Sequence, residues 1–447
     1  MSFPRYPKYK PSGVEWLGDV PEHWDVSPLK AVATHNDEVL DESTDPEQEI
    51  LYVDISSVDG VSGISVKEPM PFANAPSRAR RRVRDGDVIV STVRTYLKAI
   101  ARICDPESNL IASTGFAVIR PRNTLVPHFL GHLISASFFI EQVIARSTGV
   151  SYPAINASEL VAIPVLVPNK DEQTAIAAFL DRETGKIDEL VAEQRLLIEL
   201  LKEKRQAVIS HAVTKGLNPH APTKPSGIEW LGDVPEHWEV NRLDWICTDI
   251  NDINHEMPNA VDDGVLFLSA KDLLDDGTLN FETDVKMISE EDFERLSKKI
   301  RPRRGDIIYS RIGAALGKAR LVETDIRFNI SYSCCVVRVI EKIACVRFIR
   351  FLLDGEMILT EARMRTKGIG VPDLGLGEIG RFPIPLPPLA EQKSIVSFLQ
   401  HETGLLTTLL VEAQRGIELL QERRTALISA AVTGKIDVRS FGSKEAV

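Results

Sequence analysis

Two long stretches of this sequence share one pattern. Residues 167–216 read VPNKDEQTAIAAFLDRETGKIDELVAEQRLLIELLKEKRQAVISHAVTKG, and residues 386–435 read LPPLAEQKSIVSFLQHETGLLTTLLVEAQRGIELLQERRTALISAAVTGK. The wider blocks 149–216 and 368–435 align without gaps at an offset of 219 and are identical at 27 of 68 positions. A repeat of this length indicates two copies of one structural unit in the chain.

In both stretches the inward positions recur at alternating spacings of four and three residues. They are Leu180, Thr184, Ile187, Val191, Gln194, Ile198, Leu201, Arg205, Val208 and Ala212 in the first copy, and Leu399, Thr403, Leu406, Leu410, Ala413, Ile417, Leu420, Arg424, Leu427 and Ala431 in the second. A period of 3.5 residues over four to five heptads is typical of a coiled coil, although two helices packed separately on globular bodies would also be amphipathic. Equivalent copies related by a pseudo-two-fold axis would pair antiparallel, with the variable regions at opposite ends.

The first helix has a clear start signal. Asn169 is a suitable N-cap and Glu172 follows it by three residues, which is the spacing of a capping box. In the second copy Pro387 and Pro388 stand where a first helical turn begins, a place that tolerates proline. The sequence therefore predicts long helices over 169–216 and 388–435.

A second repeat opens each half. PSGVEWLGDVPEHW occupies Pro11–Trp24 and PSGIEWLGDVPEHW occupies Pro225–Trp238; over 11–30 and 225–244 the halves agree at 15 of 20 positions. His23 and His237 each stand between Glu and Trp, but no nucleophile or metal ligand lies beside them in the sequence. We therefore interpret the string as a Trp-anchored turn that opens each variable domain. The predicted order is a first variable domain over 11–168, a helix over 169–216, a second variable domain over 217–387 with a linker at 217–224, and a helix over 388–435.

The variable regions have mixed character. Short β-rich runs bounded by Gly, Asp or Pro are EILYVDISSVDG, GDVIVSTVR and GFAVIRP in the first region, and VLFLSAKDL, GDIIYSR and SCCVVRVI in the second. Helical candidates are Leu125–Arg146 and Ile343–Arg365. The predicted fold class is α+β: two pseudo-symmetric α/β domains separated by two long antiparallel helices that form a coiled coil.

Composition indicates a globular, multidomain protein. The chain has 447 residues, of which 43% are hydrophobic and 26% charged. No stretch approaches the roughly 20 apolar residues of a membrane span, and the N-terminus has no apolar segment typical of a secretory signal. The five cysteines show no CxxC pair, which is typical of reduced thiols. We expect a cytoplasmic protein.

Charge is unevenly distributed along the chain. The formal net charge is −11, yet segment 78–102 carries +6, segment 298–320 carries +7, and the remainder carries −24. The similar strings RDGDVIVSTVR (84–94) and RRGDIIYSRIG (303–313) place the two basic segments at equivalent positions. Repeated basic segments are typical of surfaces that contact phosphates, although a solvated charged face is the alternative. The predicted DNA-binding residues are Arg78, Arg80, Arg81, Arg82, Arg84, Ser91, Arg94, Tyr96, Lys98, Lys298, Lys299, Arg301, Arg303, Arg304, Ser310, Arg311 and Lys318.

Catalytic motifs are missing from the sequence. It contains no GxxxxGK[ST], since GAALGKA (313–319) has too short a spacing and no terminal hydroxyl, and it contains no GxGxxG before a helix, no HExxH and no NPPY-like methyltransferase tetrapeptide. We therefore predict no catalytic residues, no metal ligands and no cofactor on this chain.

The combination of motifs resembles the DNA-specificity (S) subunits of type I restriction-modification systems. The resemblance rests on the doubled PSG(V/I)EWLGDVPEHW, on IPLPPLAEQKSIVSFL with ISAAVTGKIDVR, on their first-copy counterparts, and on RRGDIIYSRIGAALGKAR. It implies two target-recognition domains that each read one half of a bipartite, asymmetric site in double-stranded DNA. It also implies that the helices set the spacer and dock two methyltransferase (M) subunits. S-adenosylmethionine, ATP and Mg would then belong to the methyltransferase and restriction (R) subunits.

The two halves differ where readout would be expected. The first reads STVRTYLKAIAR and lacks the glycines of SRIGAALGKAR in the second, a divergence expected if the halves read different DNA. Three alternatives stay open: a non-catalytic coiled-coil adaptor without DNA affinity, the specificity subunit of a related type II system that cleaves on both sides of its site, and a self-contained restriction-methylation enzyme. The recognised bases do not follow from the sequence.

Overall fold

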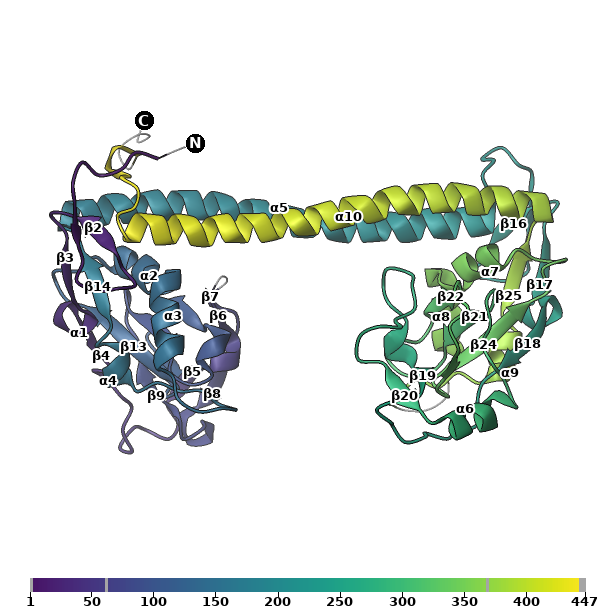
Figure 1. Ribbon diagram of the computed structural model, residues 1–447, viewed down its shortest axis with the longest axis horizontal. Helices are drawn as coiled ribbons and strands as arrows, with labels where there is room; N and C mark the ends of the chain where they lie inside the picture. The colour runs from purple at the N-terminus through teal and green to yellow at the C-terminus, as the bar shows by residue number, and fades with distance from the viewer. Residues whose placement is uncertain (1–2, 61–62, 367–369, 442–447) are drawn as a thin grey trace. The chain divides into compact units, whose positions relative to one another are not determined.

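The computed structural model describes residues 3–60, 63–366 and 370–441. The chain forms two compact units: unit 1 comprises Met1–Gln194 with Arg415–Val447, and unit 2 comprises Arg195–Gln414. Each unit therefore contains one variable region together with one part of both long helices (Figure 1).

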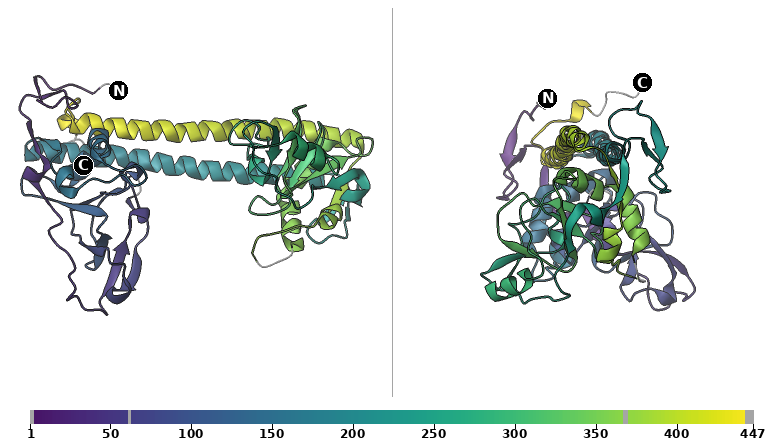
Figure 2. Two further views of the ribbon diagram at one scale, coloured as in Figure 1. Left: turned by 60° about the horizontal axis from the view of Figure 1, so that its bottom comes forward. Right: turned by 90° about the vertical axis from the view of Figure 1, so that its right-hand side faces the viewer.

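The two long helices are α5 (Lys170–Lys215) and α10 (Leu389–Val432). In unit 1 the start of α5 and the end of α10 share one core, and in unit 2 the end of α5 and the start of α10 do so, which makes the pair antiparallel (Figure 2). All twenty predicted inward positions are buried or half-buried. In unit 1, Nε of Arg424 on α10 donates to Asp188 on α5 at 2.8 Å. The predicted antiparallel coiled coil is confirmed.

Among its described residues, unit 1 contains two four-stranded sheets, in the orders β11-β10-β13-β4 and β8-β5-β12-β9, and three two-stranded ones. Its strands are β1 (Tyr9–Pro11), β2 (Asp19–Pro21), β3 (Asp25–Pro28), β4 (Ala33–His35), β5 (Glu49–Val53), β6 (Val58–Asp59), β7 (Gly63–Ile64), β8 (Glu68–Pro71), β9 (Ala79–Arg82), β10 (Val88–Ser91), β11 (Ile100–Arg102), β12 (Leu110–Ser113), β13 (Phe116–Pro121) and β14 (Pro164–Val167). Its shorter helices are α1 (Leu29–Val32), α2 (Pro127–Ser135), α3 (Ser137–Arg146) and α4 (Ala157–Leu160).

The described part of unit 2 contains a four-stranded sheet in the order β18-β24-β21-β22, a three-stranded sheet in the order β20-β19-β23, and two two-stranded sheets. Its strands are β15 (Thr223–Pro225), β16 (Asp233–Pro235), β17 (Glu239–Arg242), β18 (Cys247–Asn251), β19 (Val265–Leu268), β20 (Lys286–Ile288), β21 (Ile307–Ser310), β22 (Ala319–Leu321), β23 (Phe328–Ile330), β24 (Cys334–Val339) and β25 (Pro383–Leu386). Its shorter helices are α6 (Glu290–Ser297), α7 (Val346–Leu353), α8 (Glu356–Arg365) and α9 (Leu376–Gly380).

The two units have corresponding topologies. The sheet β11-β10-β13-β4 corresponds to β22-β21-β24-β18, and in each unit the second sheet contains one parallel pair, β12 with β5 and β23 with β19. The six predicted β-rich runs contain β5, β10, β13, β19, β21 and β24, so the predicted α+β class is confirmed. One difference is important for the interface: β9 has no counterpart among the described residues of unit 2, where α6 lies between β20 and β21.

Each predicted helix in the variable regions is in fact two helices. The break falls at Ala136 in unit 1 and at Gly355 in unit 2, equivalent positions at the repeat offset, and both residues have extended backbone. Among the described residues no single helix is long and apolar enough to cross a membrane, although α2 and α3, which meet at 60°, pass that test as a bent pair.

The doubled string packs against the starts of the two long helices. Trp24 and Trp238 are fully buried, and the imidazoles of His23 and His237 lie 2.9 and 2.7 Å from the Glu172 and Glu391 carboxylates. Asn169 caps α5 as predicted by accepting from the Glu172 backbone amide at 3.0 Å. The Glu172 carboxylate makes no return bond to the Asn169 amide: one of its oxygens lies against His23, and the other is buried without a hydrogen-bond partner among the described residues. The string therefore joins each variable region to the start of a long helix.

Candidate nucleic-acid interface

One acidic residue of each basic segment is structural. Asp87 and Asp306 are 1% exposed, at the starts of β10 and β21. Asp306 accepts from Nε and Nη2 of Arg338 at 2.8 Å, and Asp87 accepts from the corresponding atoms of Arg120 at 2.9 and 2.8 Å. The hydrogen bond to Asp306 raises the pKa of Arg338 above its usual value. Asp87 and Asp306 thus fix the starts of their central strands by binding Arg120 and Arg338. The arginines that precede them in the basic segments form other contacts.

The loops that follow these strands have the same backbone. The β10–β11 loop (Thr92–Ala99) and the β21–β22 loop (Arg311–Lys318) each contain two left-handed residues four positions apart. In the first loop these are Arg94 and Lys98, both with φ of +52°, and in the second they are Gly313 and Gly317, with φ of +87° and +93°. The first loop therefore adopts the turn of the second without its glycines.

Left-handed backbone in Arg94 and Lys98 is costly. Side-chain-bearing residues in this region carry strain of order 1–3 kcal/mol each, and such strain gathers at functional sites. Both side chains are exposed, as is Tyr96 between them, and the Arg94 guanidinium lies 5.0 Å from the centre of the Tyr152 ring. The β10–β11 loop thus presents two cations and two aromatic rings to solvent, a set suited to phosphates and bases.

Three predicted residues are buried within the fold. Ser91 and Ser310 end the central strands, with 3% and 0% exposure, and Arg311 is 4% exposed. Nη2 of Arg311 lies 2.8 Å from Asp252, and its Nη1 lies 2.8 Å from Asp373. The Ser91 hydroxyl donates to the Val93 carbonyl and Arg311 is held by its two carboxylates, whereas the buried Ser310 hydroxyl has no hydrogen-bond partner in the described part of the chain. Burial leaves these three side chains little surface for base contact.

The arginines before β10 are differently partnered. Arg78 pairs with Asp54, Arg84 pairs with Glu38, and Arg80 stacks on Phe72. Arg82 is exposed on the strand, whereas Arg81 is half-buried and has no acidic partner among the described residues.

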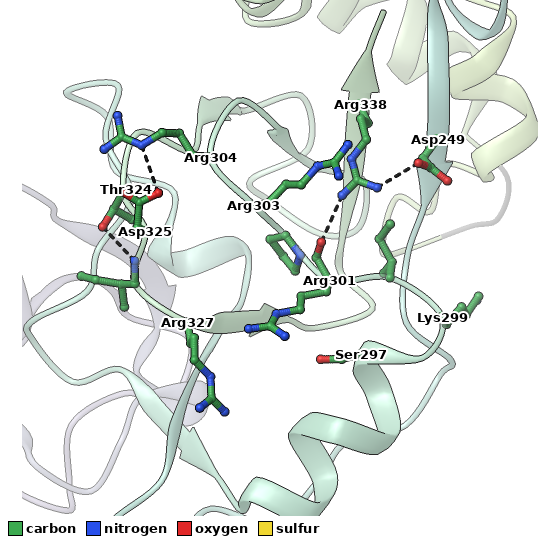
Figure 3. Close-up of a pocket in the computed structure, with 13 residues that line it drawn as sticks. Asp249, Ser297, Lys299, Arg301, Arg303, Arg304, Thr324, Asp325, Arg327 and Arg338 are labelled. Atoms are coloured by element: carbon green, nitrogen blue, oxygen red, sulfur yellow. Dashed lines mark hydrogen bonds and ion pairs between the residues drawn. The ribbon is translucent and has the colours of Figure 1, made fainter.

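In unit 2 the equivalent arginines line a hollow of about 550 Å³ rather than a strand (Figure 3). Its cationic lining consists of Lys299, Arg301, Arg303, Arg304, Arg327 and Arg338, against Asp249 and Asp325. Lys299 pairs with Asp252 and Arg304 with Asp325.

Of the other arginines of the hollow, two stack on an aromatic ring and one has no ionic partner among the described residues, whereas Arg338 pairs with Asp306 and Asp249. Arg301 and Arg327 both stack on Phe293, at 5.2 and 4.9 Å from the ring centre, and Arg303 is exposed without an ion pair in the described chain. Arg327 also pairs with Glu290. Lys298 is exposed at the end of α6, and Lys318 pairs with Asp275. The two basic segments therefore differ in structure before β10 and β21: the residues before β10 form strand β9, whereas those before β21 are coil after α6.

Sequence reasoning missed three contributors. Arg327 and Arg338 reach the hollow from beyond the basic segment and carry no local signal in the sequence. Tyr152 lies in the repeated block, at the position of Val371 in the second copy, so the repeat could have pointed to it. Within the described chain no group of His, Cys, Asp and Glu side chains is arranged to hold a metal ion.

Comparisons with known proteins agree on one family. The family model described as the type I restriction modification DNA specificity domain matches residues 21–200 and again 235–417. The chain is 22% identical to the EcoBI specificity subunit of Escherichia coli over 67% of its own length and 64% of that protein. It is 23% identical to the putative MjaX specificity subunit of Methanocaldococcus jannaschii over 95% and 96% of the two chains.

Solved structures have the same fold. A chain from a structure of a type I R-M system superposes with a TM-score of 0.72 at 24% identity and covers 92% of this chain and 98% of its own. The HsdS subunit of Thermoanaerobacter tengcongensis superposes with a TM-score of 0.50 at 25% identity, with 93% and 98% of the two chains covered.

Proposed function

The chain belongs to the family of type I restriction-modification DNA specificity subunits, and from this premise we propose that each unit reads one half of a bipartite, asymmetric site in double-stranded DNA. One observation carries the proposal. The β10–β11 and β21–β22 loops share their left-handed positions and so one backbone, yet one reads RTYLK and the other GAALG. A shared scaffold with different exposed side chains is what two different half-sites require.

The proposed DNA contacts follow from exposure. The three buried side chains, Ser91, Ser310 and Arg311, are excluded, and the exposed and half-buried ones are retained. The retained set is Arg78, Arg80, Arg81, Arg82, Arg84, Arg94, Tyr96, Lys98, Lys298, Lys299, Arg301, Arg303, Arg304 and Lys318. Most of these contacts would be to phosphates, which fix position without reading sequence.

We assign the long helices two proposed roles: setting the spacer between half-sites and docking two methyltransferase subunits. Large apolar side chains on the helices remain exposed, which supports docking. They are Leu190, Leu196, Leu197 and Leu200 on α5, and Phe398, Leu405, Leu409, Val411 and Leu419 on α10. In this proposal the chain is a non-catalytic cytoplasmic subunit, and S-adenosylmethionine, ATP and Mg act on the methyltransferase and restriction subunits.

Mapping N6-methyladenine across a genome that expresses the chain with its methyltransferase tests the function. We expect a motif of two short half-sites separated by a fixed spacer. A continuous motif would contradict two-unit reading. Purified chain that shows no salt-dependent binding to duplex DNA would favour the adaptor alternative, and adjacent genes distinguish a type I system from the related type II system.

Changing the helices tests the spacer role. Inserting one heptad at equivalent heights in α5 and α10 keeps the inward pattern and adds about 10 Å of helix. We expect the methylated motif to keep both half-sites and to gain spacer base pairs. Unchanged spacing in a folded variant would refute this role.

A further inference from the structure

Arg81 is an unusual cation for a folded domain. It projects from β9 and is half-buried, and its Nε atom is buried without a hydrogen-bond partner. Burial lowers the pKa of Arg81, and no acidic group opposes that effect. A partly desolvated guanidinium without a counter-charge destabilises the fold, and a bound anion would supply the charge that the fold lacks there.

The side chain lines a pocket of about 350 Å³ in unit 1. The pocket is lined by Asn36, Arg81, Thr92, Val93, Thr114, Phe116, Thr148, Ala154, Ile155, Asn156, Ala157 and Glu159. Besides Asn36 after β4 and Arg81 on β9, the lining comes from the β10–β11 loop, the β12–β13 segment, and the chain from Thr148 into α4. One lining residue, Val93, directly precedes Arg94 of the exposed β10–β11 loop.

Hydrogen-bond accounting shows which groups remain for a ligand. The Asn36 carbonyl already accepts from the Val118 amide at 3.0 Å, and the Asn156 side chain caps α4 by accepting from the amide of Glu159. Their side-chain NH₂ groups therefore remain as donors, beside the guanidinium of Arg81. The lining has one carboxylate, the exposed Glu159, which accepts from the Asn156 amide at 3.4 Å. A ligand rich in acceptors suits these groups.

The equivalent position in unit 2 has a different charge balance. At the repeat offset Thr92 corresponds to Arg311 and Ala154 to Asp373, and both pairs sit beside an equivalent bridge, Val93 with Ala154 and Ile312 with Asp373. Arg311 and Asp373 form an internal ion pair. Unit 2 balances Arg311 with its own carboxylates, whereas the equivalent positions of unit 1 are the neutral Thr92 and Ala154, and Arg81 has no ion pair among the described residues.

We propose that this pocket of unit 1 is a seat for a DNA phosphate, with Arg81 as its charged contact and the amide groups of Asn36 and Asn156 as further donors. The proposal rests on the proposed DNA-binding function. A phosphate has only acceptors and carries the missing charge, and Arg is well suited to it. A phosphate held here, next to the β10–β11 loop, fixes the register of that loop on the duplex.

The test compares matched variants of the full-length chain. For Arg81→Gln we expect the slope of log affinity against log salt concentration to fall by about 0.9 in magnitude, equally on target and unrelated duplexes. The melting temperature should stay the same or rise, because an uncompensated cation is removed. Arg122→Gln, an equal charge change at the exposed residue that follows β13, should leave the slope unchanged.

A second variant keeps Arg81 in place. Ala154→Asp introduces the carboxylate that unit 2 has at this position, and we expect the same loss of slope with a higher melting temperature. This variant separates loss of the phosphate seat from any failure of Arg81→Gln to fold.

The outcomes separate the possibilities. No salt-dependent DNA binding by the unaltered chain overturns the proposed function and this seat together. Normal binding with an unchanged slope in Arg81→Gln overturns only the seat. Relaxed sequence preference at one base pair would show that Arg81 reads a base edge instead. Stabilisation by inorganic phosphate that depends on Arg81, without a change in DNA slope, would show a free-phosphate site.

Discussion

Two glycines of the β21–β22 loop should respond very differently to the same substitution. Gly313 and Gly317 both have left-handed backbone, where an added Cβ costs about 1–2 kcal/mol. Replacing Gly by Ala also stiffens the unfolded chain, which returns about 0.4–1 kcal/mol. At Gly313 an added Cβ meets nothing within 4 Å, so Gly313→Ala should cost about 1 kcal/mol.

Gly317 has an additional constraint. A Cβ there lies 2.5 Å from Cδ1 of Leu359 and 3.4 Å from its Cγ, so Leu359 on α8 has to move. Overpacking of this kind costs about 1–3 kcal/mol more, which brings Gly317→Ala to about 2–4 kcal/mol. For a unit of this size each kcal/mol lowers the melting temperature by about 2–4 °C.

Thermal unfolding of four variants measures this difference. Gly317→Ala should lose several degrees more than Gly313→Ala, and in a Leu359→Ala background the cost of Gly317→Ala should fall to that of Gly313→Ala. Equal losses for the two glycines, or no rescue by Leu359→Ala, would refute the account. The same geometry explains how the equivalent position of unit 1, Arg94, accepts a large side chain: at Gly313 the surroundings are open.

Two further predictions concern buried charge. Asp306→Asn should destabilise unit 2 by about 3 kcal/mol or more in chemical denaturation, because Arg338 loses its principal buried partner. Asp325→Asn, at the exposed pair with Arg304, should change stability by less than about 1 kcal/mol. Similar losses in the two variants would show that the buried pair stabilises the unit no more than the exposed one. In unit 1, burial lowers the pKa of His132. As the pH falls below about 6.5, this histidine is protonated in the unfolded chain before it is protonated in the folded one. The free energy of unfolding should therefore fall there by up to about 1.4 kcal/mol per pH unit. His132→Gln keeps a donor for Asp181, and denaturation from pH 7 to 5 should then show a flatter profile; an unchanged slope would count against His132.

The repeat made the architecture accessible from sequence. Heptad spacing located both long helices, and the β-rich runs located the central strands, because these features depend on periodicity and local composition. The break at Ala136 was not foreseen, since apolar residues continue across it. The pairing of His23 with Glu172 was also missed, because a capping-box spacing suggested a partner for Glu172 within its own helix turn.

For the candidate site, the sequence predicts only which segments are rich in basic residues. A run of arginines indicates a basic segment, but it does not show which side chains are neutralised by residues far away in the sequence. Arg311 is bound by Asp252, 59 residues earlier, and Asp373, 62 residues later. Arg81 looks no different in the sequence, and only the fold shows it half-buried without a counter-charge.

The distribution of ion pairs separates the two units more sharply than their folds do. Among the described residues, four of the seven predicted basic residues in unit 2 form ion pairs, whereas two of seven do in unit 1. An internally neutralised cation adds little to counterion release, while an unpaired one adds its full share. Duplication therefore preserved the scaffold and left charge balance free to diverge. It follows that unit 1 should contribute more of the salt-dependent, sequence-independent DNA affinity. The smaller salt-dependent contribution of unit 2 should come mainly from the unpaired arginines of its hollow, Arg301 and Arg303.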